Sequence, residues 1–247
     1  MAFAARHELL EQMLRDGQVR RAPALSPGAP RPLPTGVPSL DAALGGGLGR
    51  GQLHELVGPP GAGGTALLRA ALASATGAGE LCALIDPGNS FDAGPCGVDL
   101  SRLLWVRPRD LVQALRAAEI ALEARFALVA LDLGDVSVLP PARAPRGVVQ
   151  VARFEKRAPS PGASPWARLA RRAEKHGGAL LLLARAPQAG TFAAATIELA
   201  RGCAQWEGRQ GAPGRFLRGA QPAFAVARHK RMPPSSPLPF TLPLEPK

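Results

Sequence analysis

Short apolar runs alternate along the chain with amphipathic segments. The runs predict strands buried on both faces, at residues 53–57, 81–86, 103–107, 127–131 and 179–184. Helices are predicted between them, from about residue 64 to 76, over 109–125 and after Pro165. Buried strands joined by helices are typical of a parallel sheet. The pattern therefore predicts an α/β fold in which helices cover both faces of a mostly parallel, twisted sheet.

The pattern changes after residue 190. Three segments of alternating polarity, at 196–200, 215–217 and 223–228, predict short strands. Alternation is typical of strands with one solvated face, which are usually antiparallel. We therefore expect a short antiparallel extension of the sheet.

The two ends of the chain differ from this core in composition. Residues 1–16 predict an N-terminal helix with Phe3, Leu10 and Leu14 on one face, and Gly17 ends it. Residues 17–33 are rich in Pro, Gly and Arg and predict a linker. The core is expected over residues 34–231. The Pro-rich residues 232–247 predict a disordered tail or a docking segment, because proline does not suit a helix or a central strand.

Charge and composition narrow the class of partner. The formal net charge of +11 favours an anionic partner, either nucleic acid or an acidic protein surface. The three cysteines have no Cys-x-x-Cys spacing, which fits a reduced cytosol, and the four histidines have no metal-ligand spacing. No apolar run approaches the ~20 residues of a membrane span. We expect a cytoplasmic protein without a metal site.

A glycine-rich loop follows the first predicted strand and precedes a helix. Its residues are Gly58-Pro59-Pro60-Gly61-Ala62-Gly63-Gly64-Thr65, which match the phosphate-binding template Gly-x4-Gly-Lys-[Ser/Thr] except that Gly64 stands where the lysine belongs. In such a loop the backbone N–H groups cradle phosphates, the lysine reaches the β/γ oxygens and the hydroxyl holds Mg²⁺. Asp132, at the end of the strand predicted over 127–131, has the position of a Mg²⁺-shell carboxylate. The alternative for these glycines is a tight strand-to-helix turn without a ligand, and for Asp132 a strand-end cap.

Over residues 34–135 the sequence resembles the RecA recombinase core. The resemblance rests on residues 35–48 as an opening segment, on Gly51-Gln52-Leu53-His54-Glu55-Leu56-Val57-Gly58 as the strand into the loop, and on residues 89–107 beyond it. In RecA-like ATPases a glutamate that activates the attacking water follows the strand that here ends at Asp86. Gly88 stands in its place. Both groups that act on the γ-phosphate are thus replaced by glycine, and we expect neither ATP hydrolysis nor a bound cofactor. Arg50 and Arg69 are nearby arginines that could substitute for the lysine.

Basic residues gather in three further places. The helix after Pro165 carries four of them, and a strand end carries another group: Arg168, Arg171, Arg172 and Lys175, then Arg228, Lys230 and Arg231. Each set is a candidate contact for an anionic partner, with a solvated basic face as the alternative. The resemblance to RecA also implies a DNA-reading loop near residues 134–164, where arginines and prolines are frequent.

The altered loop, the compact core and the basic strand end before a Pro-rich tail together resemble the ImuA proteins, a RecA-related branch. That resemblance implies a non-catalytic accessory protein or scaffold in SOS-induced, mutagenic translesion DNA synthesis. The implied partners are a polymerase-homologue subunit, RecA, an error-prone polymerase and the sliding clamp, with direct DNA contact left open. One alternative is an ATP-dependent recombinase or recombination mediator that binds single-stranded DNA. The other is a RecA-fold SOS regulator, such as a cell-division inhibitor.

Overall fold

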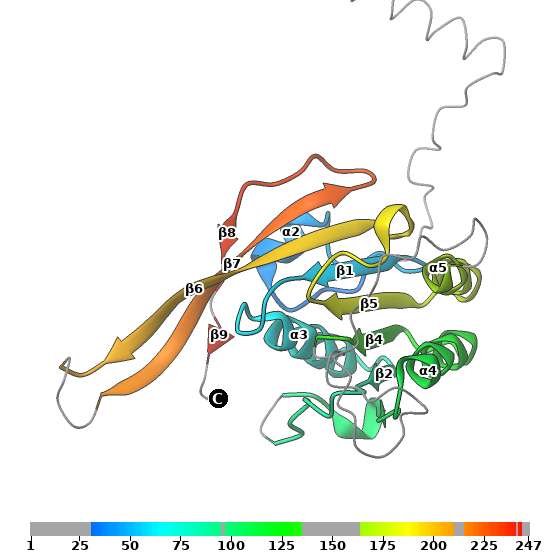
Figure 1. Ribbon diagram of the computed structural model, residues 1–247, viewed down its shortest axis with the longest axis horizontal. Coiled ribbons are helices and arrows are strands. Elements are labelled where there is room, and N and C mark those ends of the chain that lie inside the picture. Colours follow the sequence, from blue (N-terminus) through cyan, green and yellow to red (C-terminus); the bar gives the residue numbers. More distant parts are fainter. Residues whose placement is uncertain (1–30, 95–96, 135–163, 210–214, 241, 244–247) are drawn as a thin grey trace, which may run out of the picture. The chain divides into compact units, whose positions relative to one another are not determined.

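A computed structural model describes residues 31–94, 97–134, 164–209, 215–240 and 242–243 (Figure 1). Its centre is a sheet with the strand order β3-β2-β4-β5-β1-β6-β7-β8, and β9 also pairs with β7. The strands β1 (Leu53–Val57), β2 (Cys82–Ile85), β3 (Leu103–Val106), β4 (Leu128–Asp132) and β5 (Ala179–Ala184) pair in parallel, as does the start of β6 (Ala195–Glu207) with β1. The predicted mostly parallel sheet is confirmed.

Helices cover both faces of this sheet. Helix α3 (Gly64–Gly77) packs on one face, where its residues Leu68 and Leu72 join the first apolar cluster. Helices α4 (Leu111–Glu123) and α5 (Pro165–His176) pack on the other face, where Leu122 and Leu169 join a second cluster. The helices and strands of the core lie within a few residues of their predicted bounds, because their apolar spacing follows from burial on a fixed face.

The antiparallel extension is larger than predicted. Instead of three short strands, β6 and β7 (Phe216–His229) form one long two-stranded ribbon, whose far end projects beyond the helices (Figure 1). The pairing continues past Gly202 and Pro222 because the register shifts between Ala200 and Cys203. Such a bulge takes up an extra residue without ending the strand.

Part of the Pro-rich tail, expected as a disordered tail or a docking segment, is ordered against the sheet. Two short strands, β8 (Leu238–Pro239) and β9 (Leu242–Pro243), pair with β7 at the edge of the sheet, where proline is tolerated. Phe240 is buried, and its ring lies 5.8 Å from that of Phe224. At the other end of the core, buried Leu33 pairs with Leu48, so the core begins before residue 34. The helix predicted over 1–16 and most of the linker lie outside the described residues.

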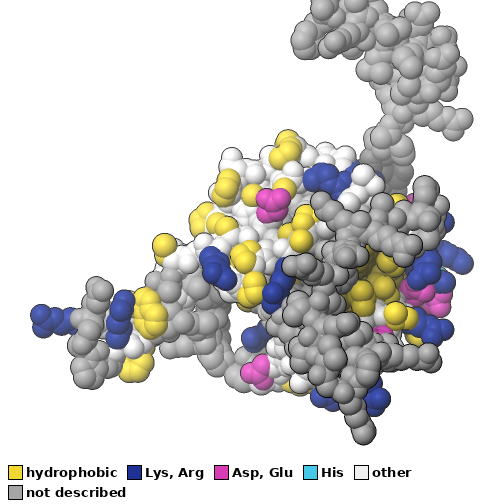
Figure 2. All heavy atoms as spheres, in the orientation of Figure 1, with side chains coloured by type: hydrophobic (Ala, Val, Ile, Leu, Met, Phe, Trp, Pro, Cys, Tyr) yellow, Lys and Arg dark blue, Asp and Glu magenta, His cyan; other side chains and the backbone are white. Residues whose placement is uncertain are grey.

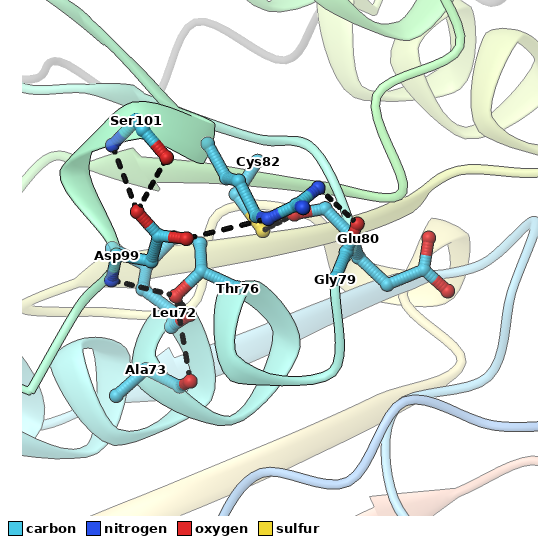
Figure 3. A network of polar contacts seen from close by, with 9 residues as sticks. Leu72, Ala73, Thr76, Gly79, Glu80, Cys82, Asp99 and Ser101 are labelled. Atoms are coloured by element: carbon cyan, nitrogen blue, oxygen red, sulfur yellow. Dashed lines mark hydrogen bonds and ion pairs between the residues drawn. The ribbon is translucent and has the colours of Figure 1, made fainter.

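Two short elements position the edge of the sheet. Helix α2 (Pro38–Ala43) follows a turn in which Asp41 accepts hydrogen bonds from the backbone and side chain of Thr35, both at 2.7 Å. At the opposite edge, the 3₁₀ helix η1 (Leu100–Arg102) is tied to the end of α3 (Figure 3). There the backbone N–H of Asp99 donates to the hydroxyl oxygen of Thr76 at 3.1 Å. The side chain of Asp99 accepts the backbone N–H of Ser101 and so caps η1. These contacts fix β3 next to β2.

Two ionisable side chains are buried in the central strand β1. His54 is 1 % exposed; its Nε2 accepts a hydrogen bond from the backbone N–H of Gly49, and its Nδ1 has no partner among the described residues. Glu55 faces the other side, where one carboxylate oxygen accepts the backbone N–H groups of Gln188 and Ala189 at 2.5 and 3.0 Å. Burial, chiefly, lowers the pKa of His54 from 6.5 to about 4.

His54 predicts a loss of stability in acid. Between pH 6.5 and 4 the unfolded chain binds a proton at this residue that the folded chain does not, so the free energy of unfolding falls as the pH falls. The group contributes about 3 kcal/mol to this loss. We expect His54→Gln to remove that part of the pH dependence, since glutamine keeps an acceptor for Gly49. Urea unfolding at pH 7, 6, 5 and 4 measures the effect, with His176→Gln as the control. A pH profile of His54→Gln that parallels the wild type would contradict the prediction.

Candidate functional site

A pocket opens at the carboxyl ends of β1, β4 and β5, where the glycine loop leaves β1. Its volume is about 210 Å³, below the ~300–1,000 Å³ of typical small-molecule sites. The predicted loop residues and the predicted acid meet here, together with the residue in the glutamate's place: Gly58, Gly61, Gly64, Thr65, Gly88 and Asp132. The structure therefore brings these predicted residues together in one pocket, which is the candidate site.

The loop glycines have structural reasons that involve no ligand. A Cβ on Gly58 would lie 2.8 Å from both the Cβ and the carbonyl oxygen of Leu199 on β6, so only glycine allows this approach. Gly61 and Gly63 have φ angles of 79° and 87°, and Gly63 is the N-cap of α3. These are left-handed conformations that favour glycine. The motif could therefore persist as a tight strand-to-helix turn.

Gly64, in the lysine's place, faces a filled space. A Cβ at this position would lie 2.6 Å from Cδ1 of Leu183 and 3.3 Å from Cδ1 of Leu199. Both leucines are buried, at 6 % and 5 % exposure. The missing cation is thus accompanied by apolar packing over the start of its side-chain path.

The two aspartates beside the pocket are engaged by the chain itself. Asp86 accepts the backbone N–H groups of Ser90 and Phe91 at 2.9 and 3.0 Å and the indole N–H of Trp105 at 3.3 Å. Asp132 accepts the N–H of Gly134 at 2.8 Å and the hydroxyl of Ser90 at 3.0 Å. Both carboxylates therefore act as caps that hold the turns after β2 and β4.

Gly88 lies in the turn after Asp86, on the pocket wall. Among the described residues, a Cβ there would meet only Asp86 Oδ1, at 4.0 Å. The two replaced positions differ in this respect, since a Cβ at Gly64 would require Leu183 to move, whereas no described residue stands in the way of a Cβ at Gly88.

Among the described residues, Arg185 rather than Arg50 or Arg69 is the basic side chain in the pocket wall. Its Nε donates to the carbonyl oxygen of Gly134 at 2.6 Å. Arg50 forms an ion pair with Glu80 instead. Sequence reasoning missed Arg185, although its place directly after the buried strand 179–184 put it at the same sheet edge as the loop. A second arginine, Arg201 on β6, donates to the carbonyl oxygen of Pro60 at 2.9 Å and so holds the loop from outside.

The predicted basic residues on α5 contact their own fold. Arg168 and Arg172 form ion pairs with Glu119 and Glu123 of α4. Arg171 donates to the carbonyl of Ala167, and Lys175 is exposed. The pairs join the two helices, with the small energies of exposed ion pairs, about 0–1 kcal/mol.

The second basic set lies at the opposite sheet edge from the pocket, because the end of β7 pairs with the start of β6. Arg228 donates to the carbonyl oxygens of Gly190 and Ala193. Lys230 and Arg231 are exposed. Neither basic set is brought to the pocket, and the predicted DNA-reading loop over 134–164 lies almost wholly outside the described residues. Within the part of the chain that the structure describes, no group of acidic, His and Cys side chains could hold a metal ion, and no helix is long and apolar enough to cross a membrane.

These features define an α/β protein with a phosphate-loop topology and an altered loop. The sequence profile of the RecA N-terminal domain matches residues 11–148, so the chain belongs to the RecA N-terminal domain family. It is 37 % identical over 113 residues to protein RecA of Chloroflexus aurantiacus (strain ATCC 29366 / DSM 635 / J-10-fl). This match covers 44 % of this chain and 32 % of that protein. It is 40 % identical over 113 residues to protein RecA of Kineococcus radiotolerans, with the same coverage. The chain thus spans about a third of the length of these relatives.

The fold also resembles a solved structure. The crystal structure of the RadB recombinase matches with a TM-score of 0.60 and 20 % sequence identity, over 85 % of this chain and 95 % of that one. At this identity the likeness concerns the fold alone. It confirms the predicted RecA-like core, while the resemblance to the ImuA branch stays a prediction.

The filled space beside Gly64 predicts that restoring the lysine fails. Gly64→Lys must displace Leu183, and we expect it to lower the free energy of unfolding by about 1–3 kcal/mol, as overpacking does. We also expect no ATP hydrolysis, since Gly88 still leaves the water unactivated. Denaturant unfolding and phosphate release measure the two effects.

The same substitution at the other end of α3 is the matched control. No atom of the described residues would lie within 4 Å of a Cβ at Gly77. Gly77→Lys should therefore leave the free energy of unfolding unchanged or raise it by up to ~1 kcal/mol through helix propensity. Equal stability of the two lysine variants, or turnover by Gly64→Lys, would contradict the prediction.

Proposed function

We propose that this chain is a RecA-fold accessory protein without ATPase activity, which acts as a scaffold in mutagenic translesion DNA synthesis. The observation that carries the proposal is the packing of Leu183 and Leu199 against Gly64. Removing one preorganised electrostatic group commonly costs ~10²–10³ in rate, and here the lysine and the glutamate are both replaced. A pocket of about 210 Å³ agrees with a loop that outlived its ligand, since both Asp132 in its wall and Asp86 beside it cap local turns.

The translesion role rests on the resemblance to the ImuA proteins. The features that support it are the altered loop, the basic strand end at Arg228–Arg231 and the Pro-rich segment that follows. The net charge of +11 suits partners with acidic surfaces. The proposed partners are a polymerase-homologue subunit first, then RecA, an error-prone polymerase and the sliding clamp.

Nucleotide binding tests the non-catalytic part. We expect calorimetry with Mg-ATP to detect no binding with a Kd below about 100 μM, because glycine stands in place of both the lysine and the glutamate. Phosphate release should equal that of buffer, with or without single-stranded DNA. An ATP-hydrolysing RecA protein under the same conditions is the positive control. DNA-stimulated phosphate release would instead support the recombinase or mediator alternative.

Partner capture tests the scaffold part. We expect the tagged full chain, co-expressed with the polymerase-homologue subunit from its own genome, to purify with that subunit in a defined ratio. The complex should persist in nuclease-treated extracts, because the contact is between proteins. A tagged RecA protein in place of this chain controls for the common fold. Recovery of cell-division proteins without the polymerase homologue would favour the regulator alternative.

A further inference from the structure

The β6–β7 ribbon extends far beyond the sheet that anchors it. The pairing of β1 with β6 ends at Glu198, and from Leu199 to Glu207 β6 pairs only with β7 among the described strands. We call this part of β6, together with the residues of β7 that pair with it, the arm. It spans about 30 Å at the usual rise of a strand. Figure 1 shows its far end separated from the helices. Residues 201–203 and 205–207 are exposed, so this end of the ribbon adds little to the core.

The tip exposes large aromatic side chains. Trp206 is 50 % exposed and Phe216 is 66 % exposed. Trp206 pairs with Leu217 and Glu207 pairs with Phe216, so the two rings lie on opposite faces of the ribbon. Figure 2 shows hydrophobic and basic side chains together at this end of the molecule. Because each face of the tip carries an exposed ring, a partner that encloses the tip can bury apolar surface on both faces.

Arginines accompany the aromatic rings. The guanidinium of Arg215 lies 4.8 Å from the centre of the Trp206 ring, a cation–π contact that orients both groups. Arg209, two residues after the end of β6, is also exposed. In sequence, residues 199–221 contain four arginines and one acidic residue, Glu207. The arm is therefore basic, and a partner surface that matches its charge would be acidic.

The edges of the arm are poorly suited to strand addition. Register shifts interrupt β6 between Ala200 and Cys203 and again between Gln205 and Trp206. Bulges of this kind are a common protection of exposed edges against pairing with another chain. The aromatic tip, rather than the edge, is therefore the surface left for an interaction.

We propose that the tip of the arm, formed by Trp206, Arg209, Arg215 and Phe216, docks into an apolar groove bordered by carboxylates on a partner protein. Trp and Arg are the residue types that most often dominate the energy of protein interfaces. Burial of the rings supplies the apolar contact, and the arginines select acidic borders and speed association. The inference rests on the proposed function in one respect, since the partner chosen for the test is the polymerase-homologue subunit.

Direct titration of the purified subunit with the full chain tests the tip. Trp206→Ala and Phe216→Ala should each raise the Kd by about 30-fold, the effect of an interface hot spot. Arg215→Glu should weaken binding mainly through the association rate and reduce its salt dependence, whereas Arg215→Lys keeps the charge and loses only the stacking. Circular dichroism melting confirms that each variant stays folded.

The matched controls are exposed apolar residues on α4. Val112 and Ile120 are 64 % and 65 % exposed, and Val112→Ala and Ile120→Ala should leave the Kd unchanged. If the tip variants bind the subunit as tightly as the wild type, the docking proposal is overturned and the proposed function stands. If the wild type does not bind the subunit, both are overturned. A loss of binding to a labelled single-stranded oligonucleotide by tip variants that still bind the subunit would identify nucleic acid as the occupant and reject the protein groove.

Discussion

The close approach of β6 to the loop after β1 is the constraint on which the candidate site depends. Because β1 lies between β5 and β6 and all three run parallel, Leu183 and Leu199 flank the loop at the carboxyl edge of the sheet. Gly58 makes this approach feasible, since a Cβ would lie 2.8 Å from Leu199. The same two leucines then occupy the space beside Gly64. The packing that holds the loop is thus also the packing that closes the lysine position.

The two aspartates at the carboxyl ends of β2 and β4 are likewise held by contacts within the fold. Asp86 and Asp132 both end buried strands, where a carboxylate could bind a metal ion, yet each accepts hydrogen bonds from its own turn. Ser90 links the two, since its backbone N–H donates to Asp86 and its hydroxyl to Asp132. A buried carboxylate needs such donors whether or not a ligand is present. Their positions are therefore required by the turns of the fold itself. This explains how a chain that lacks the lysine and the glutamate can keep the rest of the loop.

The sequence predicted the elements whose burial is local and left out what depends on distant contacts. Runs such as residues 179–184 are apolar at every position, so strand, burial and parallel pairing follow from the pattern. The predicted strands end at residues 200 and 217, and only pairing across the ribbon with a bulge carries β6 past Gly202 and β7 past Pro222. The contact of Leu183 with Gly64 joins residues far apart in sequence, and Leu183 looks like any core leucine. Arg185 was missed for the same reason, whereas the loop was found because its residues are consecutive.

The described basic side chains of α5 and of the arm differ in the partners they meet. On α5, Arg168 and Arg172 meet carboxylates of α4, and Arg228 is held by backbone carbonyl groups, so part of the positive charge is satisfied within the fold. On the arm the arginines outnumber the acids, and Arg215 meets an aromatic face in place of a carboxylate. An arginine stacked on an exposed ring keeps its charge and hydrogen-bond donors available to a partner. The arm therefore combines basic charge with exposed apolar area on one projecting element. On α5, by contrast, two arginines form ion pairs that join the helix to α4.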